Sequence, residues 1–204
     1  MHTMTAQARV TTREVRRLQT RERILGAAFA EFTRSGMAGA DVNVIAAAAG
    51  VAHGTFFFHF PSKEHVLYEL ESREEARMAA DFERFLERAH HLPAALTELV
   101  DIIKALELSV GPILFKELLA LHFSPTRPET DNWTDHPIIV LLVGEIERVR
   151  GGGSVHPEVD AFYSAIFFLL GVYGVLSTTD SADKRDTMLS KLVDTAVRGI
   201  IKEV

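Results

Sequence analysis

The stretch that decides the fold is residues 41–63, DVNVIAAAAGVAHGTFFFHFPSK. Asp41 is a good N-cap residue, and apolar residues recur behind it at helical spacing as far as Ala49. Gly50 supplies the left-handed backbone conformation that ends a helix, and a second helix is predicted over about 52–59. Two short helices joined at a glycine turn form a helix-turn-helix, whose second helix fits a DNA major groove. The stretch therefore predicts a DNA-binding element.

The phrase GVAHGTFFFHFPSKEHVL at residues 50–67 carries a more specific signal. It resembles the DNA-binding signature of the tetracycline-repressor (TetR) family of bacterial regulators. In that family a Gly-Val turn is followed by Gly-Thr, a hydrophobic residue, aromatic residues, His-Phe and Pro-Ser-Lys-Glu. The resemblance covers residues from about 15 to 70. It implies three small N-terminal helices that bind DNA, followed by a larger helical bundle that dimerises and binds a small-molecule effector.

Helical patterns also cover the rest of the chain. Thr11 and Glu14 form a capping box for a first helix that closes at Gly36, and Ser62 caps a fourth helix running to about Ala89. Further helical patterns lie at about 94–109, 113–123, 136–150, 157–177 and 183–203, separated by segments rich in Pro and Gly. No run alternates convincingly with period two. We therefore expect an all-α fold of about nine helices, with a three-helix helix-turn-helix domain in front of a bundle.

Charge separates the two expected domains. The 204 residues carry a formal net charge of −6, but residues 1–65 carry +3 and the remainder carries −9. A basic end on an acidic body fits a protein that binds a polyanion. A solvated, arginine-rich first helix explains the same distribution, so it is the motif that favours DNA. We expect a DNA-binding domain with a basic N-terminal arm over 1–62, and a ligand-binding and dimerisation domain over 63–204.

The resemblance also implies which side chains meet DNA. The expected contacts are His53, Gly54, Thr55, Phe57, Phe58 and His59 on the second helix of the motif, Asn43 before it and Lys63 after it. Asn43 is a candidate base contact whose alternative role is local helix capping, and Lys63 is a candidate phosphate anchor. Phe56 and Phe60 should turn inward. The arginines at 9, 13, 16 and 17 are expected to add contacts from a flexible arm.

Two positions depart from the family pattern. Ala52 stands where a Ser or Thr is common, and Phe57 replaces a tyrosine whose hydroxyl usually meets a phosphate. Both changes remove a hydrogen-bonding group. They put the phosphate contacts in question, but not the fold.

The effector pocket is expected in the bundle, among apolar and aromatic residues at helical spacing. The candidates are Phe82, Phe85, Leu86, Leu99, Ile102, Ile103, Leu106, Phe115, Leu118, Leu119, His122, Phe123 and Phe168. Pockets need a few polar groups among apolar walls, and His122, Trp133 and Tyr173 are candidates for that role. For any single residue a filled core is the alternative. The acidic body favours a neutral or cationic effector.

Residues 161–176, AFYSAIFFLLGVYGVL, are uncharged but shorter than the roughly 20 residues that span a bilayer. A buried helix is the better interpretation, and the resemblance implies that the last two helices pair with their twins in a dimer. The predicted dimer contacts are Phe162, Ile166, Leu170, Tyr173, Leu189, Leu192 and Ala196. Gly171 and Gly174 permit close backbone approach, either in that dimer or at a crossing within one chain.

The sequence lacks the residue patterns that metal-binding, cofactor-binding or catalytic sites require. The chain has no cysteine, and its nine histidines show no metal-ligand spacing, so we expect no metal, no cofactor and no catalytic residue. The first residues lack the apolar core of a signal peptide, and we expect a cytoplasmic protein. The favoured function is a homodimeric repressor that a small molecule releases from a palindromic operator. The alternatives are a helical-bundle enzyme, or a ligand-independent activator or architectural DNA binder.

Overall fold

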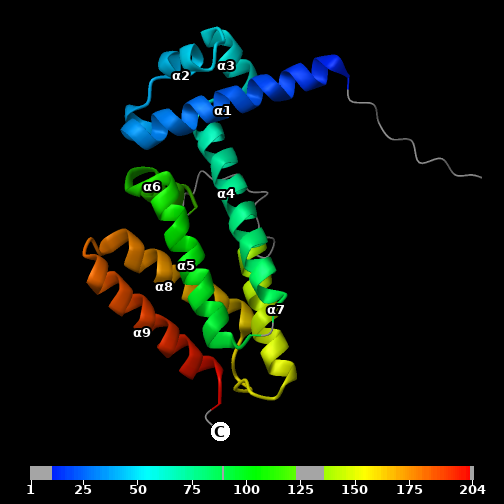
Figure 1. The fold of residues 1–204 in the computed structure, drawn as a ribbon, viewed down its shortest axis with the longest axis vertical. Helices are drawn as coiled ribbons and strands as arrows, with labels where there is room; N and C mark the ends of the chain where they lie inside the picture. Colours follow the sequence, from blue (N-terminus) through cyan, green and yellow to red (C-terminus); the bar gives the residue numbers. More distant parts are fainter. Residues whose placement is uncertain (1–10, 89, 123–135, 203–204) are drawn as a thin grey trace, which may run out of the picture. The chain divides into compact units, whose positions relative to one another are not determined.

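The computed structural model describes residues 11–88, 90–122 and 136–202. These residues form nine helices and no strand (Figure 1). The helices are α1 Thr12–Gly39, α2 Val42–Ala48, α3 His53–His59, α4 Lys63–Leu86, α5 Leu92–Val110, α6 Pro112–His122, α7 Pro137–Gly151, α8 Ala161–Thr178 and α9 Ala182–Ile200. The prediction of an all-α fold is confirmed. The chain divides into two compact units, Met1–Leu70 (unit 1) and Glu71–Val204 (unit 2), and the division falls inside α4.

The predicted capping box begins α1. The Thr11 hydroxyl accepts a hydrogen bond from the Glu14 amide at 3.2 Å, and the Glu14 carboxylate accepts one from the Thr11 amide at 2.7 Å. Gly36 interrupts the helix with a φ of 69°, which agrees with the predicted end there. Arg13, Arg16 and Arg17 therefore lie on a helix, and the prediction that they belong to a flexible arm is wrong. Arg9 lies outside the described residues.

Aromatic and aliphatic side chains from all four helices of unit 1 form its core. Its largest wholly buried members are Ile24, Phe32, Ile45, Phe56, Phe60 and Leu67. Phe56 and Phe60 turn inward as predicted, and burying a ring of that size contributes about 2 kcal/mol. These two rings hold α3 against the rest of unit 1, so the opposite side of α3 is left facing solvent.

The turn between α2 and α3 has the local geometry that its sequence predicts. Asp41 caps α2 by accepting a hydrogen bond from the Asn43 amide at 2.7 Å. Gly50 adopts a φ of 64°, where a Cβ atom would be strained. The axes of α2 and α3 meet at 94°, close to the usual helix-turn-helix angle. Ala52 provides no side-chain cap for α3, in line with its departure from the family pattern.

In unit 2, α5 packs against α6, α7 and α9, and α8 lies between α7 and α9 (Figure 1). Two groups of buried charges fasten these helices. Arg185 of α9 donates to both carboxylate oxygens of Glu107 on α5, at 2.9 and 2.7 Å, and to the Leu176 carbonyl at the end of α8. Glu145 of α7 accepts two hydrogen bonds from Arg148 and lies 3.0 Å from His90 Nε2.

The start of α8 differs from the prediction of a helix over 157–177. Asp160 caps α8 by accepting a hydrogen bond from the Tyr163 amide at 3.0 Å, so the helix begins at Ala161. Just before it, Val155 forms an isolated antiparallel bridge with Ile201. The segment that leads into α8 is thus held in place by the residue that follows α9. No local sequence pattern predicts this contact, because its two residues lie far apart in the chain.

Among the described residues, α8 is the one single helix long and apolar enough to cross a membrane by length and composition. Core helices meet the same criteria, and Ala165, Phe168 and Val172 of α8 are buried within unit 2. Gly171 packs against α9: a Cβ atom built on it would lie 2.9 Å from the Leu192 side chain. Its close approach is therefore a crossing within the chain. Gly174 has open space instead.

Candidate nucleic-acid interface and ligand cavity

Arg21 of α1 anchors the end of α3. Its guanidinium donates to the His59 carbonyl at 2.6 Å, lies 4.0 Å from the Phe60 ring centroid and pairs with Glu69. Because the last carbonyl of α3 and its buried ring are both held, the helix is fixed before it meets any ligand. Arg21 was not among the predicted site residues, since the chain gives no local sign that residues 21 and 59 meet.

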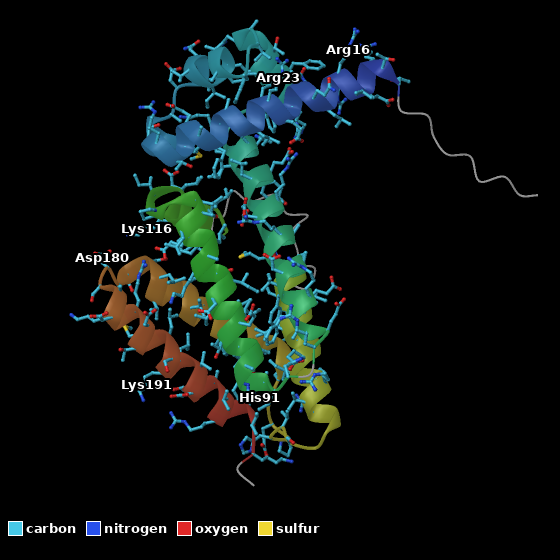
Figure 2. The ribbon with its side chains drawn as sticks, viewed as in Figure 1. Arg16, Arg23, His91, Lys116, Asp180 and Lys191 are labelled. Carbon is cyan, nitrogen blue, oxygen red and sulfur yellow. The ribbon has the colours of Figure 1, made fainter. Side chains whose placement is uncertain are left out.

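The outer side of α3 carries most of the predicted DNA contacts. His53, Gly54, Phe57 and Phe58 are exposed, while Thr55 and His59 are partly exposed. Thr55, Phe58 and His59 face α1 across a groove whose other wall includes Arg13, Arg16, Arg17 and Thr20. Figure 2 shows Arg16 and Arg23 projecting from α1. The groove is therefore basic on one side and aromatic on the other.

The arginines of this groove also act on His59. Its partial burial, and the positive charges of Arg21 and Arg17, hold the pKa of the His59 imidazole below its usual value. The free protein thus favours neutral His59. A phosphate near this ring would oppose that effect.

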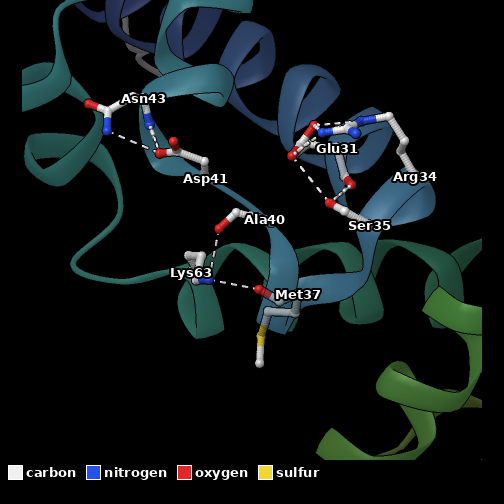
Figure 3. Close-up of polar contacts among 8 residues, drawn as sticks. All are labelled: Glu31, Arg34, Ser35, Met37, Ala40, Asp41, Asn43 and Lys63. Carbon is white, nitrogen blue, oxygen red and sulfur yellow. Dashed lines mark hydrogen bonds and ion pairs between the residues drawn. The ribbon is translucent and has the colours of Figure 1, made fainter.

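Lys63 has a second role beside the predicted phosphate contact (Figure 3). Its ammonium donates to the Met37 carbonyl at 2.7 Å and to the Ala40 carbonyl at 2.9 Å. These carbonyls belong to the end of α1, where a cation is favourable. Within the described part of the chain these two bonds use two of its three N–H groups, and the third remains for a phosphate.

Asn43 is exposed near the start of α2, as a base-contacting side chain must be. Its side-chain amide donates to the Asp41 carboxylate at 3.0 Å (Figure 3). This bond orients the amide, and it leaves a second N–H and the amide oxygen for a base edge. The predicted base contact and the alternative capping role are both compatible with this geometry.

Unit 2 contains a small cavity, with a volume of about 50 Å³ open to the centres of water-sized molecules. Its described lining consists of Glu71, Glu74, Glu75, Met78, Leu106, Phe115, Leu118, Leu119 and Tyr173. Leu106, Phe115, Leu118 and Leu119 were predicted as pocket residues, and Tyr173 as a polar group there. The three carboxylates and Met78 were missing from the predicted set. Their spacing along α4 places them on the same face as Phe82, and a search for apolar stripes passes over charged members of such a face.

The α4 side of the cavity carries three carboxylates. The Glu75 carboxylate lies within hydrogen-bonding distance of His136 Nδ1, at 2.9 Å. The Glu74 carboxylate forms an ion pair with the Arg77 guanidinium at 2.5 Å. Burial raises the pKa of the Tyr173 hydroxyl, and the charges of Glu75 and Glu71 raise it further. Tyr173 therefore stays protonated and is able to donate a hydrogen bond inside the cavity.

The other predicted pocket residues do not line this cavity. Phe82, Leu99, Ile103 and Phe168 are buried, and Phe85, Leu86 and Ile102 are half-buried. Their assignment to an effector pocket stays a prediction. The His122 side chain, Phe123 and Trp133 lie outside the described residues.

The predicted dimer residues fall in different surroundings. Leu189 is buried, Tyr173 lines the cavity and Leu192 packs on Gly171, so these three make contacts within the chain. Phe162, Ile166 and Ala196 are half-buried, and Leu170 is exposed. The exposed face of α8 is rotated by one position from the predicted one. We call it the α8 stripe, and it consists of Tyr163, Phe167, Leu170 and Gly174.

No group of three or more His, Cys, Asp or Glu side chains with metal-binding geometry occurs in the described part of the chain.

Comparisons with known proteins agree with this geometry. The family model "Bacterial regulatory proteins, tetR family" matches residues 24–70, which include α2, α3 and the turn between them. The HTH-type transcriptional regulator UidR of Escherichia coli K12 is 23% identical over 184 residues, covering 89% of this chain and 93% of that protein.

Two solved structures share the fold over nearly the whole chain. Salmonella enterica GusR is 25% identical, with a TM-score of 0.60, and the match covers 90% of this chain and 96% of that one. Thermus thermophilus FadR, a transcriptional repressor solved with lauroyl-CoA, is 21% identical, with a TM-score of 0.68 and coverage of 90% and 97%. Residues 24–70, with the helix-turn-helix and the exposed α3, therefore match the DNA-binding region of the TetR family of bacterial regulatory proteins, and the chain as a whole shares its fold with solved TetR-family regulators.

Proposed function

We propose that this protein is a homodimeric repressor that binds a palindromic operator and leaves it when a small molecule occupies the cavity of unit 2. Residues 1–62 would form the DNA-binding domain, and residues 63–204 the ligand-binding and dimerisation domain. The observation that carries the proposal is α3, held from behind by Phe56, Phe60 and Arg21 and exposed on its other side. A rigid, outward-facing short helix beside a row of arginines fits the major groove and its phosphates.

The cavity supports the ligand-responsive part of the proposal. It has apolar walls, a tyrosine hydroxyl and a carboxylate side, as expected of a site that orients a small molecule by a few polar groups. The described lining holds three carboxylates and no basic side chain. We therefore expect a neutral or cationic effector. FadR, in contrast, was solved with lauroyl-CoA, a phosphate-bearing anion.

The α8 stripe supports the dimer. Phe167 is 65% exposed and Tyr163 is 57% exposed, and their rings stack with centroids 6.1 Å apart. Large apolar surface of this kind, continuous along one helix face, marks an interaction site. A two-fold dimer would bring the stripe against its own copy, with Gly174 at a point of close approach.

The continuity of α4 supports a mechanical link. This helix begins at Lys63, in unit 1, and carries four cavity residues in unit 2. A ligand that prefers one tilt of α4 by only about 1–3 kcal/mol would change DNA affinity about 5- to 150-fold. By reciprocity, operator DNA must weaken effector binding by the same factor.

Fluorescence anisotropy with DNA that the protein selects from a randomised duplex pool would test the proposal. We expect a palindromic site, and we expect Asn43→Ala to relax its preference at one base pair. A library of neutral and cationic small molecules would then be screened for release of the selected DNA. Failure to enrich any sequence would contradict specific binding, whereas binding that no ligand changes would favour the ligand-independent alternative.

A further inference from the structure

The sequence of α3, HGTFFFH, is unusual for a helix that reads bases. It contains no Arg, Lys, Asn or Gln, the residues that form the strong bidentate hydrogen bonds to guanine and adenine edges. Its hydrogen-bonding side chains are His53, Thr55 and His59, and the last two face the groove beside α1. The rest of its exposed surface is apolar.

Two phenylalanines form most of that surface. Phe58 is 75% exposed and Phe57 is 42% exposed, although Phe56 of α3 and Phe60, which follows the helix, are completely buried. Ring contacts keep both exposed side chains in place. Phe57 packs edge-on against His53 and Phe56, with centroids 5.0 and 5.2 Å away, and Phe58 packs edge-on against His59 at 5.3 Å. Both rings therefore offer exposed apolar surface that a partner can contact.

The surroundings indicate which partner these rings meet. Phe58 lies in the groove lined by Arg13, Arg16 and Arg17, where an apolar protein surface would leave several cations without water. A polyanion with small apolar groups on it suits both features. In the DNA major groove the apolar group that distinguishes one base pair from another is the C5-methyl group of thymine.

We propose that α3 discriminates bases mainly through thymine C5-methyl groups, which contact the rings of Phe57 and Phe58. This inference rests on the proposed DNA-binding function and adds the chemistry of its specificity. It requires thymines at fixed positions in each half-site. It also requires that the methyl group itself, rather than the A·T hydrogen-bonding pattern, carries the preference.

Replacement of single thymines by deoxyuridine tests this directly, because the substitution removes one methyl group and keeps every hydrogen-bonding group of the base pair. The probe is the duplex that the full-length protein selects from a randomised pool, and affinity is measured by fluorescence anisotropy. At the contacted thymines we expect deoxyuridine to weaken binding about fourfold per methyl group, the value for burying one methylene.

Protein variants identify the ring responsible. In Phe57→Ala or Phe58→Ala, the deoxyuridine penalty at the contacted thymine should disappear, while the penalties at other positions stay. Leu18→Ala is the matched control, since Leu18 is a large exposed apolar residue (54%) on α1 and its truncation should leave every penalty unchanged. Circular dichroism would verify that each variant keeps its helices.

The outcomes separate the inference from the function on which it rests. If the pool yields no preferred sequence, the DNA-binding proposal fails. If a sequence is enriched but deoxyuridine binds like thymine at every position, only the methyl inference is overturned. It is also overturned if both alanine variants keep the full deoxyuridine penalty.

Discussion

Helix α3 of unit 1 and the interior of unit 2 place polar and apolar groups in opposite ways. Unit 1 exposes the aromatic rings of Phe57 and Phe58, whereas unit 2 encloses the carboxylates of Glu71, Glu107 and Glu145. The surface of α3 that is proposed to contact DNA (here called the reading surface) must be exposed to solvent. The side chains buried behind α3 therefore have to stabilise that helix. A cavity must keep polar groups inside, so these groups need partners that offset their loss of water. Changes at the functional residues of unit 1 should therefore spare the fold, and changes to the buried charges of unit 2 should not.

The largest effect is expected from breaking the Arg185–Glu107 pair. Arg185→Ala leaves the nearly buried Glu107 without its bidentate partner and removes a donor from the end of α8. We expect a loss of about 3–5 kcal/mol in the free energy of unfolding, measured by urea titration with circular dichroism. Lys104→Ala is the control, because the Lys104–Asp186 pair is exposed and should contribute less than about 1 kcal/mol. Equal losses in the two variants would contradict the contrast between the units.

The α8 stripe is an exposed surface of unit 2 that is proposed to form the dimer, so substitutions in it should change binding and leave the fold intact. Phe167→Asp places two like charges in the proposed dimer contact, and we expect sedimentation to show an about 100-fold weaker dimer with an intact fold. The affinity for the selected DNA should fall with it. Val140→Asp changes another exposed apolar residue, on α7 (51% exposed), and should leave the dimer unaltered. Wild-type protein that stays monomeric at all concentrations would rule out this role for the stripe.

Lys63 tests the comparison of the two units at a residue of unit 1 that is expected to contribute both to stability and to DNA binding. Lys63→Met removes the donor to the Met37 and Ala40 carbonyls, and we expect a stability loss of about 1 kcal/mol. DNA affinity should fall about equally for all sequences, and the log–log salt slope should drop by about one. Lys116→Met, an exposed lysine on α6, is the control. An unchanged salt slope would restrict Lys63 to its role at the end of α1.

The smallest effect concerns protonation at the reading surface. Partial burial and the charges of Arg21 and Arg17 lower the pKa of His59, while a bound phosphate would raise it, so DNA binding should take up a proton. Affinity should therefore rise as pH falls, by about threefold between pH 7.5 and 6. His59→Gln should flatten this dependence and His53→Gln should retain it. A pH profile that is identical in wild type and His59→Gln would show that His59 does not meet a phosphate.

Short-range signals made the DNA-binding unit predictable from the sequence. The Thr11–Glu14 capping box, the Asp41 cap and the positive φ of Gly50 each involve residues at most three positions apart, so the pattern of residues encodes them directly. The inward turn of Phe56 and Phe60 follows from helical periodicity. The family signature then depends on the same local stretch, which is why the fold and the class of function could be predicted without coordinates.

The tertiary structure alone decided which residues meet across helices. The crossing of α8 and α9 places Leu192 on Gly171 and rotates the exposed face to Tyr163 and Phe167, one position from the predicted phase. The same kind of non-local packing turns Glu71 and its neighbouring carboxylates into a cavity wall. A sequence gives each helix its period and its caps, but helix rotation and crossing are set by side chains far apart in the chain. The helices and their reading surface were therefore determined locally, and the cavity and the outer face of α8 were determined by packing.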